Sequence, residues 1–306
     1  MNQAEVNFLA SKGIKVIKIL GKGAYGVVFY VYCDHYKSYF ALKKVPEPKF
    51  MDGELQCLVN IDDPRVVRLY KKFANDGNIY MLMEYCRTDL LAELRQKHKF
   101  TDSQMKSYIR DMALSIKACH DRNAAHSDIK PSNFLIDFYG RLKISDFGMC
   151  GIFTGQPCSS KRGGTLEFMA PEIFSNVAYN PIVADIWAFG VSIYLIVVRK
   201  FPFDGESDYD IKSNIQEGQY NIRLVKDQQL RDVISRCLEV DVKNRATIDE
   251  LLKMPYFQDE DDQSTRLVKK SSTKGIIVPK MIKNSFFSRS NILPHNVVSR
   301  NRATFA

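Results

Sequence analysis

Apolar and polar residues alternate along the first part of the chain, most clearly in IKVIKIL (14–20) and VVFYVY (27–32). Such alternation, rich in β-branched and aromatic residues, is typical of β-strands with one buried face. Glycines separate these runs, so residues 14–45 are predicted to form a meander of strands. The run NIYMLMEYC (78–86) predicts one further strand.

The spacing of apolar residues changes after Thr101, where they recur every three or four positions. The residues at this helical spacing, which predict a long amphipathic helix, are Ile109, Met112, Ala113, Ile116 and Cys119. Further helices are predicted near residues 185–199, 207–217, 228–238 and 247–253. A strand-rich first third before a helix-rich remainder predicts an α+β fold with a small β-rich N-lobe, a larger helical C-lobe and a cleft between them.

The chain is predicted to consist of an extension, a folded body and a tail. With 306 residues, 45% of them hydrophobic, it can bury one large core or two modest ones. The body is assigned to residues 14–257, the N-terminal extension to residues 1–13 and a flexible tail to residues 258–306. The apolar run Ile186–Val198 is too short to cross a bilayer and predicts a buried helix, so no membrane insertion is expected.

The cysteines and the first residues indicate the compartment. Seven cysteines, an odd number without a Cys-x-x-Cys pair, predict free thiols rather than a disulfide framework or a zinc site. The first fifteen residues lack the basic-then-apolar order of a secretory signal. We therefore expect a reducing, intracellular location, with cytoplasm and nucleus both open.

The net charge of +9 is concentrated in the tail. Residues 263–306 contain nine Lys or Arg and no Asp or Glu, which leaves 35 basic and 35 acidic residues in the rest of the chain. The body is thus neutral and carries no strong nucleic-acid signal. A solvated extension is the simpler interpretation of the basic tail, and binding to acidic partners is the alternative.

A glycine-rich segment lies between the first two predicted strands. Gly21, Gly23 and Gly26 with Val28 form G-x-G-x-x-G-x-V, in which glycines let the backbone approach phosphates closely. A glycine-rich hairpin without a ligand would look similar. A strand, not a helix, follows the last glycine, which argues against a dinucleotide fold, and the G-x-x-x-x-G-K-[ST] signature is absent.

A lysine occurs inside the next apolar strand, in Phe40-Ala41-Leu42-Lys43. A buried lysine is costly unless it meets an anion, and the α- and β-phosphates of a nucleotide would supply one. An edge lysine that points outward is the alternative. The combination with the glycine segment favours nucleotide binding.

Two later motifs supply groups for phosphoryl transfer. The stretch HSDIKPSN contains Asp128, Lys130 and Asn133, and Asp146-Phe147-Gly148 follows thirteen residues later. Transfer of a γ-phosphoryl group needs a carboxylate to orient the attacking hydroxyl and metal ions to neutralise charge. Asp128 is the candidate base, Lys130 would stabilise the phosphoryl group, and the oxygens of Asn133 and Asp146 suit Mg²⁺.

Together these motifs resemble the signature set of the eukaryotic protein kinases of the serine/threonine type. The resemblance covers residues 14–257 and extends to Ala170-Pro171-Glu172, the helix aspartate Asp185 and Arg245 as the partner of Glu172. It implies a catalytic domain with the bilobal fold, ATP and Mg²⁺ as cofactors, and protein substrates.

The resemblance also implies roles for residues that could otherwise be ordinary core. Around adenine it implies side chains above and below the base, hinge hydrogen bonds from Glu84 and Cys86, and Met83 at the inner pocket. The side chains that would enclose the base are Leu20, Val28, Ala41 and Leu135. A stack typical of an active kinase would comprise Leu58, Leu69, His126 and Phe147.

The same comparison indicates the substrate. Lys130 and the pair Gly164-Thr165 resemble serine/threonine kinases rather than tyrosine kinases. Ser132 and the short segment that ends at Asp89 lack the carboxylates with which some members hold substrate arginines. We therefore expect no strong preference for arginine before the acceptor residue.

The sequence departs from the family pattern at Ser127, where most members have an arginine that binds the phosphorylated activation segment. Serine cannot make that charge-assisted contact. The activation segment, Met149–Glu172, contains Thr154, Ser159 and Ser160 as candidate phosphorylation sites, but the arginine that usually binds the phosphate is missing. The alternative is that another basic residue, for example Arg87 or Arg110, replaces it.

A second departure concerns the glutamate that would pair with Lys43. Glu54 fits, but it follows Lys43 by only eleven residues, and two prolines and Gly53 disfavour an earlier helix start. The helix is expected to begin near Asp52, a candidate N-cap. A short helix and Ser127 together suggest that activity does not depend on an arginine–phosphothreonine contact.

Several alternatives remain at this point. The combination HSD-x-KP-x-NFL resembles spindle-checkpoint kinases of the monopolar-spindle type, and PSNFL resembles the kinases that trigger replication origins. An inactive pseudokinase that only binds partners would be expected to lose Lys43, Asp128 or Asp146, and none is lost. A small-molecule kinase and a nucleic-acid-binding module fit the motifs and the neutral body less well.

Overall fold

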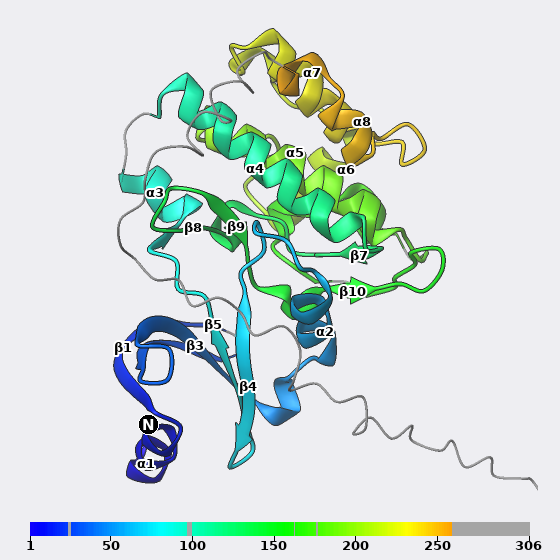
Figure 1. The fold of residues 1–306 in the computed structure, drawn as a ribbon. Coiled ribbons are helices and arrows are strands. Elements are labelled where there is room, and N and C mark those ends of the chain that lie inside the picture. The colour runs from blue at the N-terminus through cyan, green and yellow to red at the C-terminus, as the bar shows by residue number, and fades with distance from the viewer. Residues whose placement is uncertain (24–25, 97–99, 162, 176, 259–306) are drawn as a thin grey trace, which may run out of the picture. The chain divides into compact units, whose positions relative to one another are not determined.

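A computed structural model describes residues 1–23, 26–96, 100–161, 163–175 and 177–258. The chain divides into two compact units, Met1–Gln263 and Ser264–Ala306, and all described residues lie in the first. The predicted basic tail from residue 259 onward lies outside the described residues. Within the first unit, the predicted two-lobed α+β fold is confirmed (Figure 1).

The N-lobe is built on a five-stranded antiparallel sheet in the order β1-β2-β3-β5-β4. Its strands are β1 (Ile14–Lys22), β2 (Val27–Cys33), β3 (Ser38–Pro46), β4 (Leu69–Asn75) and β5 (Asn78–Met83). The predicted meander is confirmed, and the strand predicted over 78–86 ends at Met83. Strand β4 was not foreseen, because its alternation is weak and charged.

The two faces of this sheet are buried in different ways. Val45, Met81 and Met83 point into the large core that continues into the C-lobe. Their strand neighbours Leu42 and Leu82 point the other way and, with others, form a second, smaller core. Side chains of a strand alternate between faces, so the sheet separates the two cores.

The outer core is covered by helix α1 (Gln3–Ser11), which lies in the N-terminal extension and was not predicted (Figure 1). Leu9 is buried in the small core, and the Asn2 side chain caps the helix by accepting from the Glu5 amide. Glu5 is itself buried and binds Lys44 Nζ at 2.7 Å and the Tyr80 hydroxyl at 2.9 Å. The extension is therefore an integral part of the N-lobe.

The C-lobe is mainly helical. Its helices are α3 (Leu90–Gln96), α4 (Asp102–His120), α5 (Pro181–Val198), α6 (Asp208–Glu217), α7 (Gln228–Cys237) and α8 (Ile248–Leu252). The five helices predicted after Thr101 are all confirmed to within a few residues. Helix α4 starts at a capping box in which the side chains of Thr101 and Gln104 bond each other's backbone amides.

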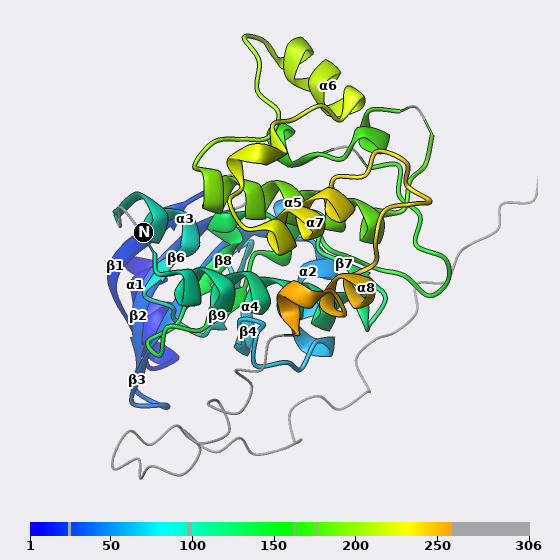
Figure 2. The same cartoon turned by 90° about the horizontal axis from the view of Figure 1, so that it is seen from above.

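Helix α5 is long and apolar enough to cross a membrane by length and composition alone. However, 72% of it is buried inside the protein, where α4 and α7 lie beside it (Figure 2). This matches the buried helix predicted from the run Ile186–Val198.

Two small sheets of short strands hold the loops near the junction of the two lobes. One small sheet contains β6 (Thr88–Asp89), β8 (Phe134–Ile136) and β9 (Leu142–Ile144), and another pairs β7 (Ala124–Ala125) with β10 (Gly151–Ile152). Single 3₁₀ turns include η2 (Pro131–Asn133) and η3 (Phe147–Met149). Helix α2 (Asp52–Asn60) packs against η3 and β10.

Candidate active site

The glycine segment joins β1 to β2 in a tight turn. The Gly23 amide donates to the Gly26 carbonyl at 2.9 Å, and the reverse bond is 3.3 Å long. A Cβ atom on Gly26 would lie 2.0 Å from the backbone oxygen of Lys44, so only glycine fits there. At Gly21 and Gly23 a Cβ would meet nothing within 4 Å. Residues 24 and 25 lie outside the described residues.

Lys43 lies on β3, and its side chain is only 11% exposed. Its Nζ atom donates to Glu54 Oε1 at 2.5 Å and to Asp146 Oδ1 at 2.9 Å. The alternative of an outward-pointing edge lysine is therefore wrong. Burial, the largest influence, lowers the pKa of Lys43, but Glu54 and Asp146 together outweigh it and raise that pKa above its usual value.

Glu54 comes from α2, which brings a carboxylate 3% exposed to Lys43. The helix begins at Asp52 as expected, but Asp52 is not its N-cap. Met51 occupies that position and makes no side-chain cap bond, because its side chain has no oxygen to accept from a backbone amide. Gly53 is required here for a different reason: its Cβ would lie 2.9 Å from the Cys150 carbonyl oxygen.

Asp128, Lys130 and Asn133 gather within one loop. Lys130 Nζ lies 2.8 Å from Asp128 Oδ2. Asn133 Nδ2 donates to the same carboxylate oxygen at 2.9 Å and to the Asp128 carbonyl at 2.7 Å. Both bonds use the nitrogen of the amide, so its oxygen is the atom that Asn133 can offer to a cation.

Asp146 stands across from this loop in a left-handed backbone conformation, with φ of 61°. Its side chain is 42% exposed, although its neighbour Phe147 is fully buried. Burial is the largest single influence on the pKa of Asp146 and raises it. The charge of Lys43 and its hydrogen bond lower the pKa and together outweigh burial, so the pKa lies below its usual value. The carboxylate is thus ionised and partly open.

The predicted stack of side chains is brought together in the large core. The rings of Phe147 and His126 meet edge to face at 4.9 Å between centroids. Leu58 is buried in the same core, and Leu69 packs against it. His126 Nε2 lies 2.9 Å from the Ser145 carbonyl oxygen, which ties the loop before Asp128 to the strand before Asp146.

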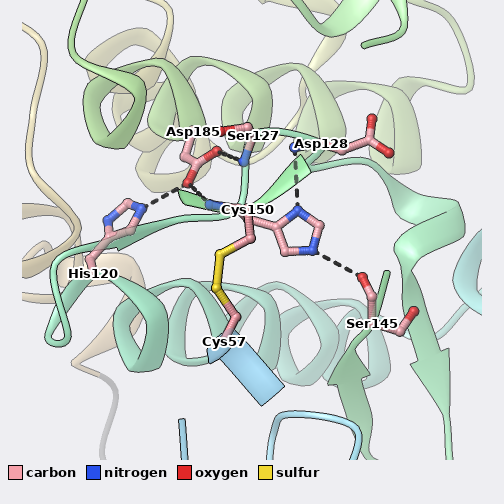
Figure 3. The surroundings of a disulfide bond; sticks show 8 residues. Cys57, His120, Ser127, Asp128, Ser145, Cys150 and Asp185 are labelled. Atoms are coloured by element: carbon pink, nitrogen blue, oxygen red, sulfur yellow. Dashed lines mark hydrogen bonds and ion pairs between the residues drawn. A yellow bond between two sulfur atoms is a disulfide. The ribbon is translucent and has the colours of Figure 1, made fainter. Parts of the chain in front are cut away.

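Asp185 fixes the backbone that leads to Asp128 (Figure 3). Its carboxylate accepts from the amides of His126 at 2.7 Å and Ser127 at 2.8 Å, and it lies 3.1 Å from His120 Nε2. Ser127 has a φ of 62°, a left-handed conformation that non-glycine residues rarely adopt. These bonds offset that cost and orient the next residue, Asp128.

Two further contacts are present in the C-lobe, of which the pair of Arg245 with Glu172 was predicted. Lys130 Nζ donates to Thr165 Oγ1 at 3.2 Å. Arg245, whose side chain is fully buried, binds both oxygens of Glu172 at 2.6 and 2.9 Å. The bidentate pair holds the end of the activation segment against the helical core.

The residues predicted around adenine lie on two sides of the site. Most are on the face of the N-lobe sheet that is turned toward the C-lobe, and Leu135 is on β8 opposite. Ala41 and Leu135 are partly exposed between buried strand neighbours, Val28 is also partly exposed, and Leu20 is 40% exposed. Met83 is buried and pairs with Ala41 across the strands.

Between the lobes, the Glu84 carboxylate binds the buried Lys143 at 3.0 Å. Burial raises the pKa of Cys86 to about 12. Lys143 was missed by sequence reasoning. It lies in an apolar strand just as Lys43 does, and the same burial argument would have selected it. Its Nζ also donates to the Pro64 carbonyl at 2.7 Å, so it links β9 to the segment before β4 and to Glu84.

The donor atoms at this site fit magnesium bound together with a nucleotide. No group of three or more His, Cys, Asp or Glu side chains suited to a metal occurs among the described residues. Mg²⁺ in phosphoryl-transfer enzymes uses one or two protein oxygens and completes its shell with phosphates and water. The open carboxylate of Asp146 and the amide oxygen of Asn133 match that chemistry.

The expectation of free thiols throughout is wrong at one place, because Cys57 and Cys150 form a disulfide (Figure 3). Their separation of 93 residues hides the pairing from any local motif. The free cysteines among the described residues are Cys33, Cys86, Cys119, Cys158 and Cys237, of which Cys158 alone is exposed.

The activation segment is tied to its surroundings by backbone contacts. Strand β10 pairs with β7, and Ser159 forms a β-bridge with Tyr179. Ser159 is half-buried, whereas Thr154 and Ser160 are exposed. A cavity of about 640 Å³ lies beneath this segment, lined among others by Ser127 and Asp185.

The two arginines proposed as substitutes for the one missing at position 127 are engaged elsewhere. Arg87 Nη2 binds Glu93 at 3.2 Å, and Arg110 Nη1 binds the Phe257 carbonyl at 2.7 Å. Neither contact involves the activation segment, so neither of these two arginines takes the place of the missing one.

Comparison with known proteins agrees with this geometry. The chain is 28% identical over 293 residues to the probable serine/threonine-protein kinase MARK-A of Dictyostelium discoideum, covering 92% of this chain and 26% of that protein. It is 31% identical over 255 residues to calcium-dependent protein kinase 3 of Plasmodium berghei, covering 78% and 45%. It is 29% identical over 255 residues to Aurora/IPL1-related protein kinase 2 of Caenorhabditis briggsae, covering 79% of this chain and 83% of that protein.

The chain spans between about a quarter and about half the length of most of these curated relatives. The match to a family model is independent of that difference in length. The protein kinase domain model aligns with residues 14–257, and the chain therefore belongs to the protein kinase family.

Proposed function

We propose that this protein is an ATP-dependent protein serine/threonine kinase that is catalytically active. The carrying observation is that Lys43, Glu54 and Asp146 form one ion cluster next to the loop that holds Asp128 and Asn133. Three separate chain segments converge there with the groups that phosphoryl transfer requires. The relatives named as serine/threonine kinases support the same conclusion.

In this proposal each residue acts on a defined part of the reaction. Lys43, held by Glu54, binds the α- and β-phosphates, and the glycine segment covers them with backbone amides. Asp128 accepts the proton of the substrate hydroxyl while Lys130 stabilises the charge on the phosphoryl group. Asp146 and Asn133 would hold Mg²⁺, which neutralises phosphate charge when bound.

The substrate is proposed to be a serine or threonine in a protein without a strong requirement for upstream arginine. The Lys130–Thr165 contact supports the acceptor type implied by the sequence. Acids near the entrance are already engaged: Asp89 Oδ1 accepts from the Ala92 amide, and Glu93 binds Arg87. A peptide library should give a profile without dominant arginine, and a profile dominated by it would contradict this proposal.

An inactive, interaction-only pseudokinase is the rival function. The assay that separates the two measures phosphate transfer from Mg-ATP to casein by the wild type and by Asp146→Asn. We expect transfer by the wild type and its loss in the variant. A well-folded wild type that transfers phosphate to no protein offered would favour the rival.

Activity is further proposed not to require a phosphorylated activation segment. Ser127 uses its backbone amide to bind Asp185, and Arg87 and Arg110 bind elsewhere. Protein treated with phosphatase until Thr154, Ser159 and Ser160 carry no phosphate should retain its turnover. Near-zero activity that returns on phosphorylation would contradict this.

The remaining expectations extend this proposal to the cell. An intracellular location and no membrane insertion are proposed from the sequence alone. The basic tail is proposed to be a solvated extension, with binding to acidic partners as the alternative. The subfamily resemblance to monopolar-spindle kinases likewise stays a prediction.

A further inference from the structure

The disulfide connects the two elements that supply the partners of Lys43 (Figure 3). Cys57 lies on α2, three residues after Glu54, and therefore nearly one turn further along the same helix face. Cys150 follows Asp146 by four residues, at the end of η3. The covalent bond thus fixes the helix that carries Glu54 to the segment that carries Asp146.

Other contacts at this junction are close but not covalent. The backbone of Gly53 passes near the Cys150 carbonyl oxygen, and α2 packs on η3 and β10. Strand β10 begins directly after Cys150 and pairs with β7, which precedes His126. A shift of α2 would therefore be felt in both acidic motifs of the site.

Helix α2 depends on such contacts more than an ordinary helix does. It has nine residues and no side-chain cap at its start. Isolated helices of this length are marginal in water, so tertiary contacts must keep this one in place. On its site-facing side the strongest of these contacts are the Lys43–Glu54 ion pair and the Cys57–Cys150 bond.

One end of the disulfide lies beside a cavity. Cys57 is fully buried, whereas Cys150 is 8% exposed and lines the cavity of about 640 Å³ beneath the activation segment. Ser127 lines the same cavity, so the residue that replaces the family arginine leaves space beside Cys150. The cavity therefore marks the side of the disulfide on which a small thiol would approach.

We propose that Cys57–Cys150 is a reversible thiol–disulfide site that holds α2 against the activation segment, in the role that an arginine–phosphate contact would otherwise serve. The proposal rests on the proposed kinase function. It takes the low-molecular-weight thiol and disulfide couple, of which glutathione is an example, as its reaction partner. Intracellular disulfides, where they occur, are usually redox-sensing or catalytic rather than permanent.

The exchange is a balanced two-step reaction. A thiolate attacks the Cys150 sulfur through the cavity, the bond to Cys57 breaks, and Cys57 leaves as a thiolate that takes up a proton. A second thiolate then attacks the small-molecule sulfur of the mixed disulfide. Cys150 leaves as a thiolate that takes up a proton, and the two small thiols form a disulfide. Two thiols are oxidised for each protein disulfide reduced, and oxidation of the protein is the reverse.

Reduction should make α2 more mobile and weaken the ion pair between Glu54 and Lys43. The oxidised full-length protein should show a kcat/KM for casein about 5- to 150-fold above that of the reduced protein, the usual range of coupling between two sites. In glutathione buffers of increasing oxidation, the activity should follow the amount of linked Cys57–Cys150 peptide measured by mass spectrometry. Amide hydrogen exchange over residues 52–60 should rise on reduction.

Variants separate this site from general thiol effects. Cys57→Ser and Cys150→Ser should match the reduced wild type and no longer respond to the buffer. Cys158→Ser, a cysteine of the same cavity outside the bond, should respond as the wild type does. The reduced wild type provides the same comparison without a substitution, in case a serine variant fails to fold.

Three results would overturn the proposal: no linked peptide in any oxidising buffer, equal helix exchange in both states, or activity that differs by less than twofold. Absence of phosphate transfer in both states would instead contradict the proposed kinase function. The linked peptide and the exchange of residues 52–60 would then still decide whether the thiol–disulfide site exists.

Discussion

Two buried ion clusters in this protein use similar groups for different ends. Lys43 shares its ammonium group between Glu54 and Asp146, and Asp146 stays 42% exposed. Arg245 directs its guanidinium at Glu172 in a bidentate pair and also bonds two carbonyl oxygens, with a side chain that is fully buried. The first, open cluster can offer a carboxylate oxygen of Asp146 to a ligand. The second is closed, because Arg245 binds both oxygens of Glu172 away from solvent.

The difference shows how burial of charge should be interpreted. A buried ion pair alone says little about function, because structural pairs also lie in the core. The functional cluster is marked by a partner that is ionised yet reachable, next to a loop with further oxygens. Asp185 resembles the Arg245–Glu172 cluster in this respect, since backbone amides and His120 already bind its carboxylate.

The largest effect is expected on catalysis, from Asp128→Asn. Loss of the base should lower kcat by about 10²- to 10⁴-fold, with little change in the midpoint of thermal unfolding. Steady-state assays and thermal melts check both parts. Asp62→Asn, at a side chain 91% exposed, is the matched control and should retain full activity. A similar loss in both variants would mean that the open cluster is not special.

The closed cluster should respond in stability. Arg245→Met leaves the Glu172 carboxylate, 12% exposed, without its partner and should lower the free energy of unfolding by about 3–5 kcal/mol. Lys117→Met removes an exposed pair with Asp121 and Asp249 and should cost less than about 1 kcal/mol. Urea unfolding measures both, and equal losses would contradict the distinction between buried and exposed pairs.

A third buried acid, Glu5, should resemble the closed cluster. Its carboxylate binds Lys44 and Tyr80 and is 8% exposed, with no catalytic loop beside it. Glu5→Gln keeps the shape but removes the charge, and it should lower the free energy of unfolding by about 1–2 kcal/mol. Urea unfolding tests this value, and kcat at saturating ATP should be nearly unchanged. A large drop in kcat with unchanged stability would instead place α1 in the catalytic machinery.

The smallest effect concerns pH. The pKa of Asp146 lies below its usual 3.8, so its stabilising charge is present above that value and is lost as pH falls through the lower, folded-state pKa. The pKa of Lys43 lies above its usual 10.5, so its contribution is present below that value and is lost as pH rises through the higher one. The KM for ATP should therefore stay constant between about pH 6 and 9. A KM that titrates within this window would show that another group controls binding.

Much of the site could be predicted because its residues lie close together in the sequence. Asp128, Lys130 and Asn133 span six positions, and their mutual contacts follow from one loop. Lys43 was selected by the cost of burying a lysine in an apolar strand, and its expected partner Glu54 was found. Its contact with Asp146 was not predicted. The same reasoning was not applied to Lys143, although it would have succeeded there.

What could not be predicted depends on pairs that are distant in the sequence. The docking of α1 rests on Glu5 meeting Tyr80, 75 positions away. The N-cap of α2 was misplaced because the preceding extended segment puts Met51, not Asp52, at the helix start.

The sequence by itself determined most strands of the N-lobe sheet, the helices after Thr101 and the identity of the reactive groups, because periodicity and local spacing are properties of short segments. Only the tertiary structure decided that Cys57 and Cys150 join and which charged groups remain open to a ligand. Pairing and exposure depend on how distant segments pack, and no local pattern in the chain encodes that packing directly.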